Sequence, residues 1–349
     1  MTAKIPKVQI FMKKSAKSPG TGEAGKIAVV GAFKITSTTP KLYTSLADAQ
    51  EELGDDTTFD GCAALPYLWA NGATSLLCVN VSTKSGDTWT KTVTTSNLAT
   101  ALTSIKGEDW DILFVAAALT DTLIADVDEY LDDTFEMKYP AGYVAALTGQ
   151  TDAANITTAG LAGEHCYGLI TQQLTVNGTQ LSVLNSAAYY CGLIAGMRVG
   201  NTMTMKTIPG VTAVSPELSF ETGGAGKALL EAGITTVKCQ DRGAGRYIVV
   251  NSEQPNGLDL YVNRVRDYVI KQFSLHQFLG ERNNEATLNE IKQEVDRVKL
   301  DCVKSLELLR DIEYTVEKRN ATTVDINIQK LLFDGLITEI NVYVTVVVE

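Results

Sequence analysis

Short apolar runs alternate with amphipathic segments through the first part of the chain, and the alternation predicts strands followed by helices. Strands are predicted at 27–33, 75–81, 110–118, 143–147 and 166–175, and helices at 44–53, 61–71, 97–105, 123–135 and 186–197. Repeated strand–helix–strand units are typical of an α/β sheet flanked by helices. We therefore expect such a sheet in this region.

The pattern changes from about residue 210. A short helix at 227–232 and strands at 236–239 and 247–251 precede two long amphipathic helices. Their apolar stripes are Val262, Val265, Val269 and Phe273 in the first helix, and Leu288, Ile291, Val295, Val298, Cys302 and Leu309 in the second. The other face of the second helix carries Lys292, Arg297, Lys299, Lys304 and Arg310 among acidic residues. That face fits a docking surface and a solvated surface equally well.

Both ends of the chain have the pattern of exposed strands. The segment 340–348 alternates Ile340, Val342, Val344, Val346 and Val348 on one face, and no residue from Asn341 to Val348 is charged. A free, uncharged strand aggregates unless it has a designated partner. Residues 7–12 are also strand-like. Two such ends are what strand exchange between subunits requires.

The charge of the chain is unevenly distributed. The 349 residues carry a net charge of −11, which argues against a free-standing nucleic-acid binder. Residues 1–26 hold six lysines against Glu23 alone, a net +5, which leaves −16 on the remainder. This distribution fits either an arm that lies on an acidic neighbour or a simple lysine-rich tail. The chain has no apolar run of about 20 residues and no signal-peptide core, so we expect a soluble, unsecreted product.

Two glycine-rich loops resemble phosphate-binding motifs. Gly20–Lys26 precedes a predicted strand, although such loops must precede a helix, and Ile27 replaces the hydroxyl residue that binds magnesium. In the second loop, Gly223–Lys227, Glu221 stands where the first glycine belongs and Ala228 where the hydroxyl belongs. We interpret both loops as flexible connections.

Candidate catalytic chemistry is sparse. The six cysteines include no Cys-x-x-Cys pair and are interpreted as reduced core thiols. The two histidines, His165 and His276, lack metal-ligand spacing, and His165 is not expected to face Cys166. The carboxylates Asp126, Asp128, Asp132 and Asp133 are interpreted as a solvated acidic face. We therefore predict no enzyme activity, no catalytic residue, no cofactor and no metal.

The ordered set of segments resembles the contractile phage tail sheath protein family, which also occurs in tail-like bacteriocins and contractile injection systems. The matching stretches are 26–31, 44–49, 69–73, 188–196 with 209–211, 230–235, 261–270, the final helix, and the strand at 337–348. The resemblance covers nearly the whole chain and is strongest in its C-terminal third. This chain would be a compact member without large outer insertions.

The resemblance implies an α/β (α+β) protein with four parts. These are an N-terminal linking arm at 1–25, an outer α/β sandwich-like domain at 26–209, an inner C-terminal domain at 210–335, and a C-terminal linking strand at 336–349. The inner domain would contain two long helices and a sheet completed by exchanged terminal strands. Subunits of this family form a helical sleeve, usually six-fold, around an inner tube, and contraction drives the tube through a cell envelope.

The expected partners are further copies of the chain, the inner tail tube protein, and baseplate and tail terminator proteins, with no direct nucleic acid and no membrane insertion. The expected location is a virion tail or tail-like particle assembled in the host bacterial cytoplasm. Intersubunit linking is assigned to Lys7, Val8, Ile10, Val342, Val344 and Val346, and inner-tube contact to Lys292, Arg297, Lys299 and Lys304. The alternative is a soluble α/β enzyme that binds a phosphorylated ligand at Gly20–Lys26 or Gly223–Lys227. Negative-stain microscopy separates the two, because sleeves indicate the first and discrete oligomers the second.

Overall fold

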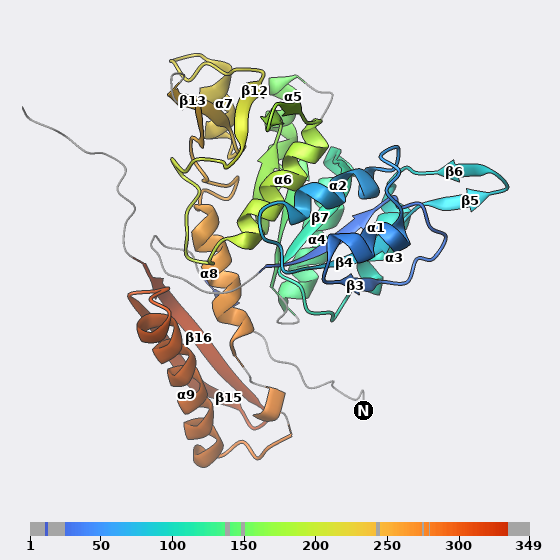
Figure 1. Cartoon of the computed structure of the whole chain (residues 1–349). Helices are drawn as coiled ribbons and strands as arrows, with labels where there is room; N and C mark the ends of the chain where they lie inside the picture. The colour runs from blue at the N-terminus through green and yellow to red at the C-terminus, as the bar shows by residue number, and fades with distance from the viewer. Residues whose placement is uncertain are drawn as a thin grey trace, which may run out of the picture.

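A computed structural model gives the fold of the chain (Figure 1). It describes residues 11–12, 25–136, 140–147, 151–241, 245–273, 276–278 and 280–333. The larger body contains a six-stranded sheet, and a narrower unit of helix and hairpin extends from it. The predicted α/β class and its two C-terminal amphipathic helices are confirmed, although the second helix ends at Ser305, before Leu309.

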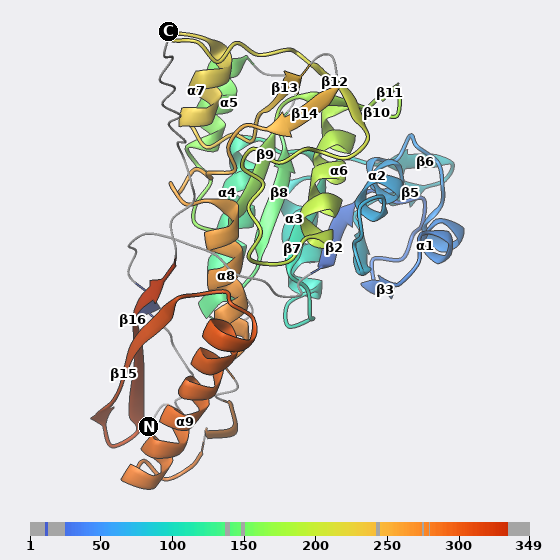
Figure 2. The same cartoon turned by 60° about the vertical axis from the view of Figure 1, so that its left-hand side comes forward.

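The six-stranded sheet has the order β3-β4-β2-β7-β8-β9, and all its pairings are parallel except that of β3 with β4. Its strands are β2 (Lys26–Gly31), β3 (Lys41–Tyr43), β4 (Ser75–Asn80), β7 (Ile112–Ala118), β8 (Gly142–Ala146) and β9 (Cys166–Ile170). Its helices are α1 (Leu46–Leu53), α2 (Asp60–Trp69), α3 (Thr95–Ser104), α4 (Asp121–Glu136), α5 (Asp152–Ala159) and α6 (Val183–Gly196). Helices α2 and α6 cover one face, and α3 and α4 cover the other (Figure 2). Strands buried on both faces read as continuous apolar runs, which is why the sequence pattern located them well.

Smaller sheets and a short helix extend this body. The predicted strand at 166–175 is two strands, because the chain leaves the main sheet after β9 and re-enters as β10 (Gln173–Val176) in another sheet. That sheet also contains β11 (Thr179–Gln180) and β12 (Val211–Ser215). The larger body also contains the hairpin of β5 (Thr83–Ser85) and β6 (Thr88–Thr90), helix α7 (Ala225–Glu231), and the hairpin of β13 (Val237–Asp241) and β14 (Arg246–Val249). Helix α5 and strands β3, β5, β6, β11 and β12 were not predicted.

The narrower unit has its own core. It consists of α8 (Leu260–Lys271), α9 (Glu285–Leu300) with a π-helical end at Asp301–Ser305, and the antiparallel hairpin of β15 (Asp311–Asn320) and β16 (Thr323–Leu332). The hairpin was not predicted. Strand β1 (Phe11–Met12) lies parallel on β16 (Figure 2).

Two clusters of buried apolar side chains divide the chain near residue 260. The larger runs from Ile27 to Leu260, so the segment between 211 and 249 packs with the main sheet. The smaller contains Val199 and residues from Tyr261 to Phe333. The expected domain boundary at 210 stays a prediction. The outer and inner roles of the two parts stay a prediction.

Candidate assembly interface

The β15–β16 hairpin forms a small sheet with helix α9 packed on one face. Ile312, Val316 and Ile326 are buried beneath the helix. The Tyr314 hydroxyl donates to Asp296 Oδ1 of α9 at 2.6 Å, which fixes helix and hairpin to each other. The hairpin is thus a supported platform and not a free ribbon, which would be only marginally stable in water.

The two edges of this platform differ. Strand β16 carries β1 in parallel register, with Phe11 opposite Asn327 and Met12 opposite Ile328. Strand β15 pairs with β16 and with no other strand among the described residues. An open edge offers a row of backbone donors and acceptors to an added strand. The predicted linking residues Lys7, Val8, Ile10, Val342, Val344 and Val346 lie outside the described residues, so their role stays a prediction.

Two of the four residues assigned to tube contact are already engaged within the chain. Arg297 contacts Glu294 Oε1 at 2.8 Å and Asp301 Oδ2 at 3.0 Å, and these carboxylates raise its pKa. Lys299 contacts Asp311 Oδ1 at 2.7 Å and lowers the pKa of that carboxyl by hydrogen bonding. Neither cation is free for an external partner without breaking these contacts.

The other two, Lys292 and Lys304, are exposed. Neither forms an ion pair with any residue in the described ranges. Lys292 contributes only its carbonyl to an internal contact, which accepts from the Tyr314 hydroxyl at 3.5 Å. The structure therefore divides the predicted basic face into two available and two internally paired cations.

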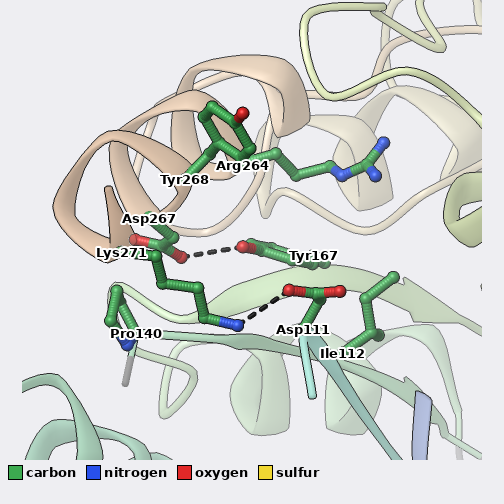
Figure 3. A pocket seen from close by; sticks show the side chains of 8 residues that line it. All are labelled: Asp111, Ile112, Pro140, Tyr167, Arg264, Asp267, Tyr268 and Lys271. Carbon is green, nitrogen blue, oxygen red and sulfur yellow. Dashed lines mark hydrogen bonds and ion pairs between the residues drawn. The ribbon is translucent and has the colours of Figure 1, made fainter. Parts of the chain in front are cut away.

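A buried polar seam joins α8 to the main sheet (Figure 3). The Tyr167 hydroxyl of β9 donates to Asp267 Oδ2 at 2.8 Å, and Arg266 Nε donates to Asp267 Oδ1 at 2.7 Å. Lys271 contacts Asp111 Oδ1, just before β7, at 2.7 Å. The cavity between these groups holds only about 10 Å³, room for roughly one water. The seam is filled by its own side chains.

The seam makes α8 the joint between the two cores. Val262, Val265 and Val269 pack into the smaller core, whereas the charged side chains turn toward the larger body. Burial raises the pKa of Tyr167, and the neighbouring Asp267 raises it further, so the phenol stays a donor. This role was missed from sequence. Arg266 and Asp267 inside an amphipathic helix were the available signal, because charges on a helix that is covered on two sides need partners.

Replacing Asp267 by Ala is expected to destabilise the protein by about 3–5 kcal/mol, because it removes the nearer of two carboxylates that pair with the buried Arg266 and the acceptor of the Tyr167 hydroxyl. For a chain of 349 residues, a loss of this size corresponds to a fall in Tm of about 4–7 °C, measured by thermal circular dichroism. The matched control is Glu313→Ala, which removes an exposed pair with Lys330 and is expected to cost about 0–1 kcal/mol. Equal effects of the two substitutions would contradict the seam.

Of the first glycine-rich loop, only Gly25 and Lys26 belong to the described residues. Gly25 lies against α6, where an added Cβ would meet the Ala195 carbonyl at 2.8 Å, and Lys26 begins β2. In the second loop Gly224 is the N-cap of α7, a helix of only seven residues. The interpretation of this loop as a flexible connection is therefore wrong, because it begins a helix.

His165 and Cys166 point to different partners. His165 Nε2 lies 3.0 Å from Asp132 Oδ1 of α4, and the Cys166 thiol donates to Gln254 Oε1 at 3.6 Å. Burial raises the pKa of Asp128, which lies beside the same histidine. Asp132 is largely exposed but Asp128 is half-buried, so the acidic face of α4 is solvated only in part.

Within the described ranges, no group of three or more His, Cys, Asp or Glu side chains could hold a metal ion. No helix in this part of the chain is long and apolar enough to cross a membrane.

Comparisons with known proteins point in one direction. A family model for the phage tail sheath protein central domain matches residues 91–251. No curated protein matches the chain. The fold is similar to the sheath tail protein of Desulfitobacterium hafniense (TM-score 0.64, 13% identity, 88% of this chain and 93% of that one). It is also similar to Lin1278, the sheath tail protein of Listeria innocua (TM-score 0.63, 12% identity, 86% of this chain and 90% of that one). The helical sheath of the anti-feeding prophage in its contracted state is similar as well, with a TM-score of 0.66, 14% identity and 99% of both chains covered.

Proposed function

Since this chain belongs to the phage tail sheath protein family and is a structural subunit of a contractile tail sheath, we propose that it polymerises as a helical sleeve around an inner tube. Contraction of the sleeve then drives the tube through a cell envelope. The match of residues 91–251 to the sheath central domain carries this proposal. Solved sheaths with the same fold support it.

The hairpin β15–β16 is the proposed link between subunits. Its β16 edge takes the N-terminal arm, including Lys7, Val8 and Ile10, and its open β15 edge takes the strand that contains Val342, Val344 and Val346. In the sleeve, both strands come from neighbouring copies. Each backbone hydrogen bond contributes about 0.5–1.5 kcal/mol net, so a strand of several residues forms a link that survives subunit rotation.

The proposed sleeve is a helical stack of six-fold rings, and its further partners are the inner tail tube protein, the baseplate and the tail terminator. The proposed location is a virion tail or tail-like particle assembled in the bacterial cytoplasm. The narrower unit, with α9 and the hairpin, faces the tube, and the main body faces outward. The solved anti-feeding prophage baseplate, matched over 99% of both chains, supports a position next to a baseplate.

We also propose that the chain is not an enzyme and needs no cofactor. In an open α/β sheet, ligands bind outside the carboxyl ends of the strands where the strand order reverses, here between β2 and β7. Ala32 and Phe33 after β2 are fully buried, and Leu119 after β7 is 2% exposed. An added Cβ on Gly31 would meet Ala116 at 2.7 Å. These buried side chains at the switch point support the proposal, whereas the alternative enzyme would bind its phosphorylated ligand at Gly20–Lys26 or Gly223–Lys227.

Electron microscopy of the purified protein, expressed with and without its tube protein, tests the proposed function. Regular sleeves or contracted tubes are the expected particles. Discrete globular oligomers under all conditions would favour the α/β enzyme.

Charge reversal at Lys292 and Lys304 is expected to weaken the contact with the tube, because these are the two assigned cations that form no ion pair with a described residue. Each exposed contact is worth only about 0–1 kcal/mol, but every subunit of the sleeve repeats it. The double variant Lys292→Glu/Lys304→Glu should yield mostly empty or prematurely contracted sheaths in micrographs. Lys84→Glu, on the distant β5–β6 hairpin, is the control. Normal loading of the double variant onto tubes would refute the placement.

A further inference from the structure

The N-terminal arm lies on its own chain in the structure. Strand β1 pairs in parallel with β16, with Phe11 opposite Asn327 and Met12 opposite Ile328. The β16 edge of the β15–β16 hairpin is therefore covered by two residues of the same subunit. The opposite edge, along β15, has no added strand among the described residues. Within the described part of the subunit, one edge of the hairpin is thus covered and the other carries no further strand.

Pairing within one chain and pairing between chains form the same strand contacts. Exchange of an identical element is therefore nearly neutral in energy, and other contacts between subunits decide which pairing prevails. Only the twelve residues 13–24 separate Met12 from Gly25 at the start of the body. A tether of this length gives an effective concentration of about 1 mM. In dilute solution, the arm of a separate copy is present at a far lower concentration and cannot displace the subunit's own arm from the β16 edge.

The covering strand is also short. Two residues form few backbone hydrogen bonds, each worth about 0.5–1.5 kcal/mol net, so the strand can be displaced once a neighbour is held nearby. A covered edge resists non-specific edge-to-edge pairing, whereas an uncovered one invites it.

We propose that the free subunit caps the β16 edge with its own residues 11–12, and that this cap keeps free subunits from polymerising. The inference rests on the proposed strand exchange between subunits. The open β15 edge engages a second copy first. The two arms then exchange onto each other's β16 edges, because the neighbour is now held at a local concentration comparable to that of the tethered arm. Growth thus needs an existing row of subunits or a baseplate to start it.

A reversible disulfide tests the cap in the full-length chain. Neighbouring strands lie about 4.8 Å apart, within the roughly 4.4–6.8 Å between Cα atoms that a disulfide spans. The variant carries Met12→Cys and Ile328→Cys, which are register partners. The single variants Met12→Cys and Ile328→Cys control for reaction with the native cysteines, five of which are buried.

Dilute, oxidised double variant is expected to run on a non-reducing gel as a monomer with an internal crosslink. Sleeve mass after pelleting should fall at least about 10-fold and recover on reduction, which also shows that the variant is folded. If the free double variant forms no internal crosslink, the proposed cap is overturned. If sleeves of the same variant then contain crosslinks between chains, the proposed strand exchange still holds. Regular sleeves from fully crosslinked monomer would overturn both the cap and the exchange at this edge.

Discussion

Deletion of residues 1–15 is expected to abolish sleeve formation and to leave a folded, soluble subunit. The deletion removes β1 and with it the strand that is proposed to link one copy to the next. It removes little of the fold, because the first buried apolar side chain of either described core is Ile27. The lost pairing amounts to a few hydrogen bonds of about 0.5–1.5 kcal/mol each, so Tm should fall by only a few degrees.

Pelleting and negative-stain microscopy measure the assembly of this variant, and circular dichroism measures its fold. Deletion of residues 1–3 leaves the strand-like segment 7–12 intact and serves as the control. If the shorter chain still forms regular sleeves, the arm is not a linking element.

Val344→Asp is expected to stop polymerisation as completely as the deletion of residues 1–15. The substitution places a carboxylate on the apolar face of the proposed C-terminal linking strand, where burial without a partner is costly. Each buried valine of that face contributes about 1.5–3 kcal/mol as an upper estimate. The isolated subunit should keep its circular dichroism spectrum and a Tm close to that of the unpolymerised parent protein.

The matched control for this substitution is Thr345→Asp, which adds the same charge on the opposite face of the strand. It should assemble more completely than Val344→Asp. Unfolding of the isolated Val344→Asp subunit would assign the strand to the subunit's own core and end its linking role.

The parallel strands were predictable from sequence because burial on both faces produces unbroken apolar runs, as in 112–118. The β15–β16 hairpin was missed although Val324, Ile326 and Ile328 alternate with Asp325 and Asn327. One face of the hairpin packs on α9 and the other carries charges such as the Glu313–Lys330 pair, so its overall hydrophobicity is low. The alternation itself was the signal that could have located it.

The candidate contact residues show where sequence reasoning ends. The spacing of Lys292, Arg297, Lys299 and Lys304 placed all four on a polar helix face. Spacing on one helix cannot show that Asp311, at the start of the next strand, pairs with Lys299. The same holds for the α8 seam, because Tyr167 and Asp267 are 100 residues apart in sequence.

The central claim is that neighbouring copies complete the β15–β16 sheet, and the most direct test is a cryo-electron microscopy map of the assembled protein at side-chain resolution. The account predicts a helical sleeve in which strands from other copies lie along both the β15 and β16 edges of each hairpin. Density that traces residues 11–12 of every assembled subunit to its own β16, with no strand from another copy at either edge, would contradict it.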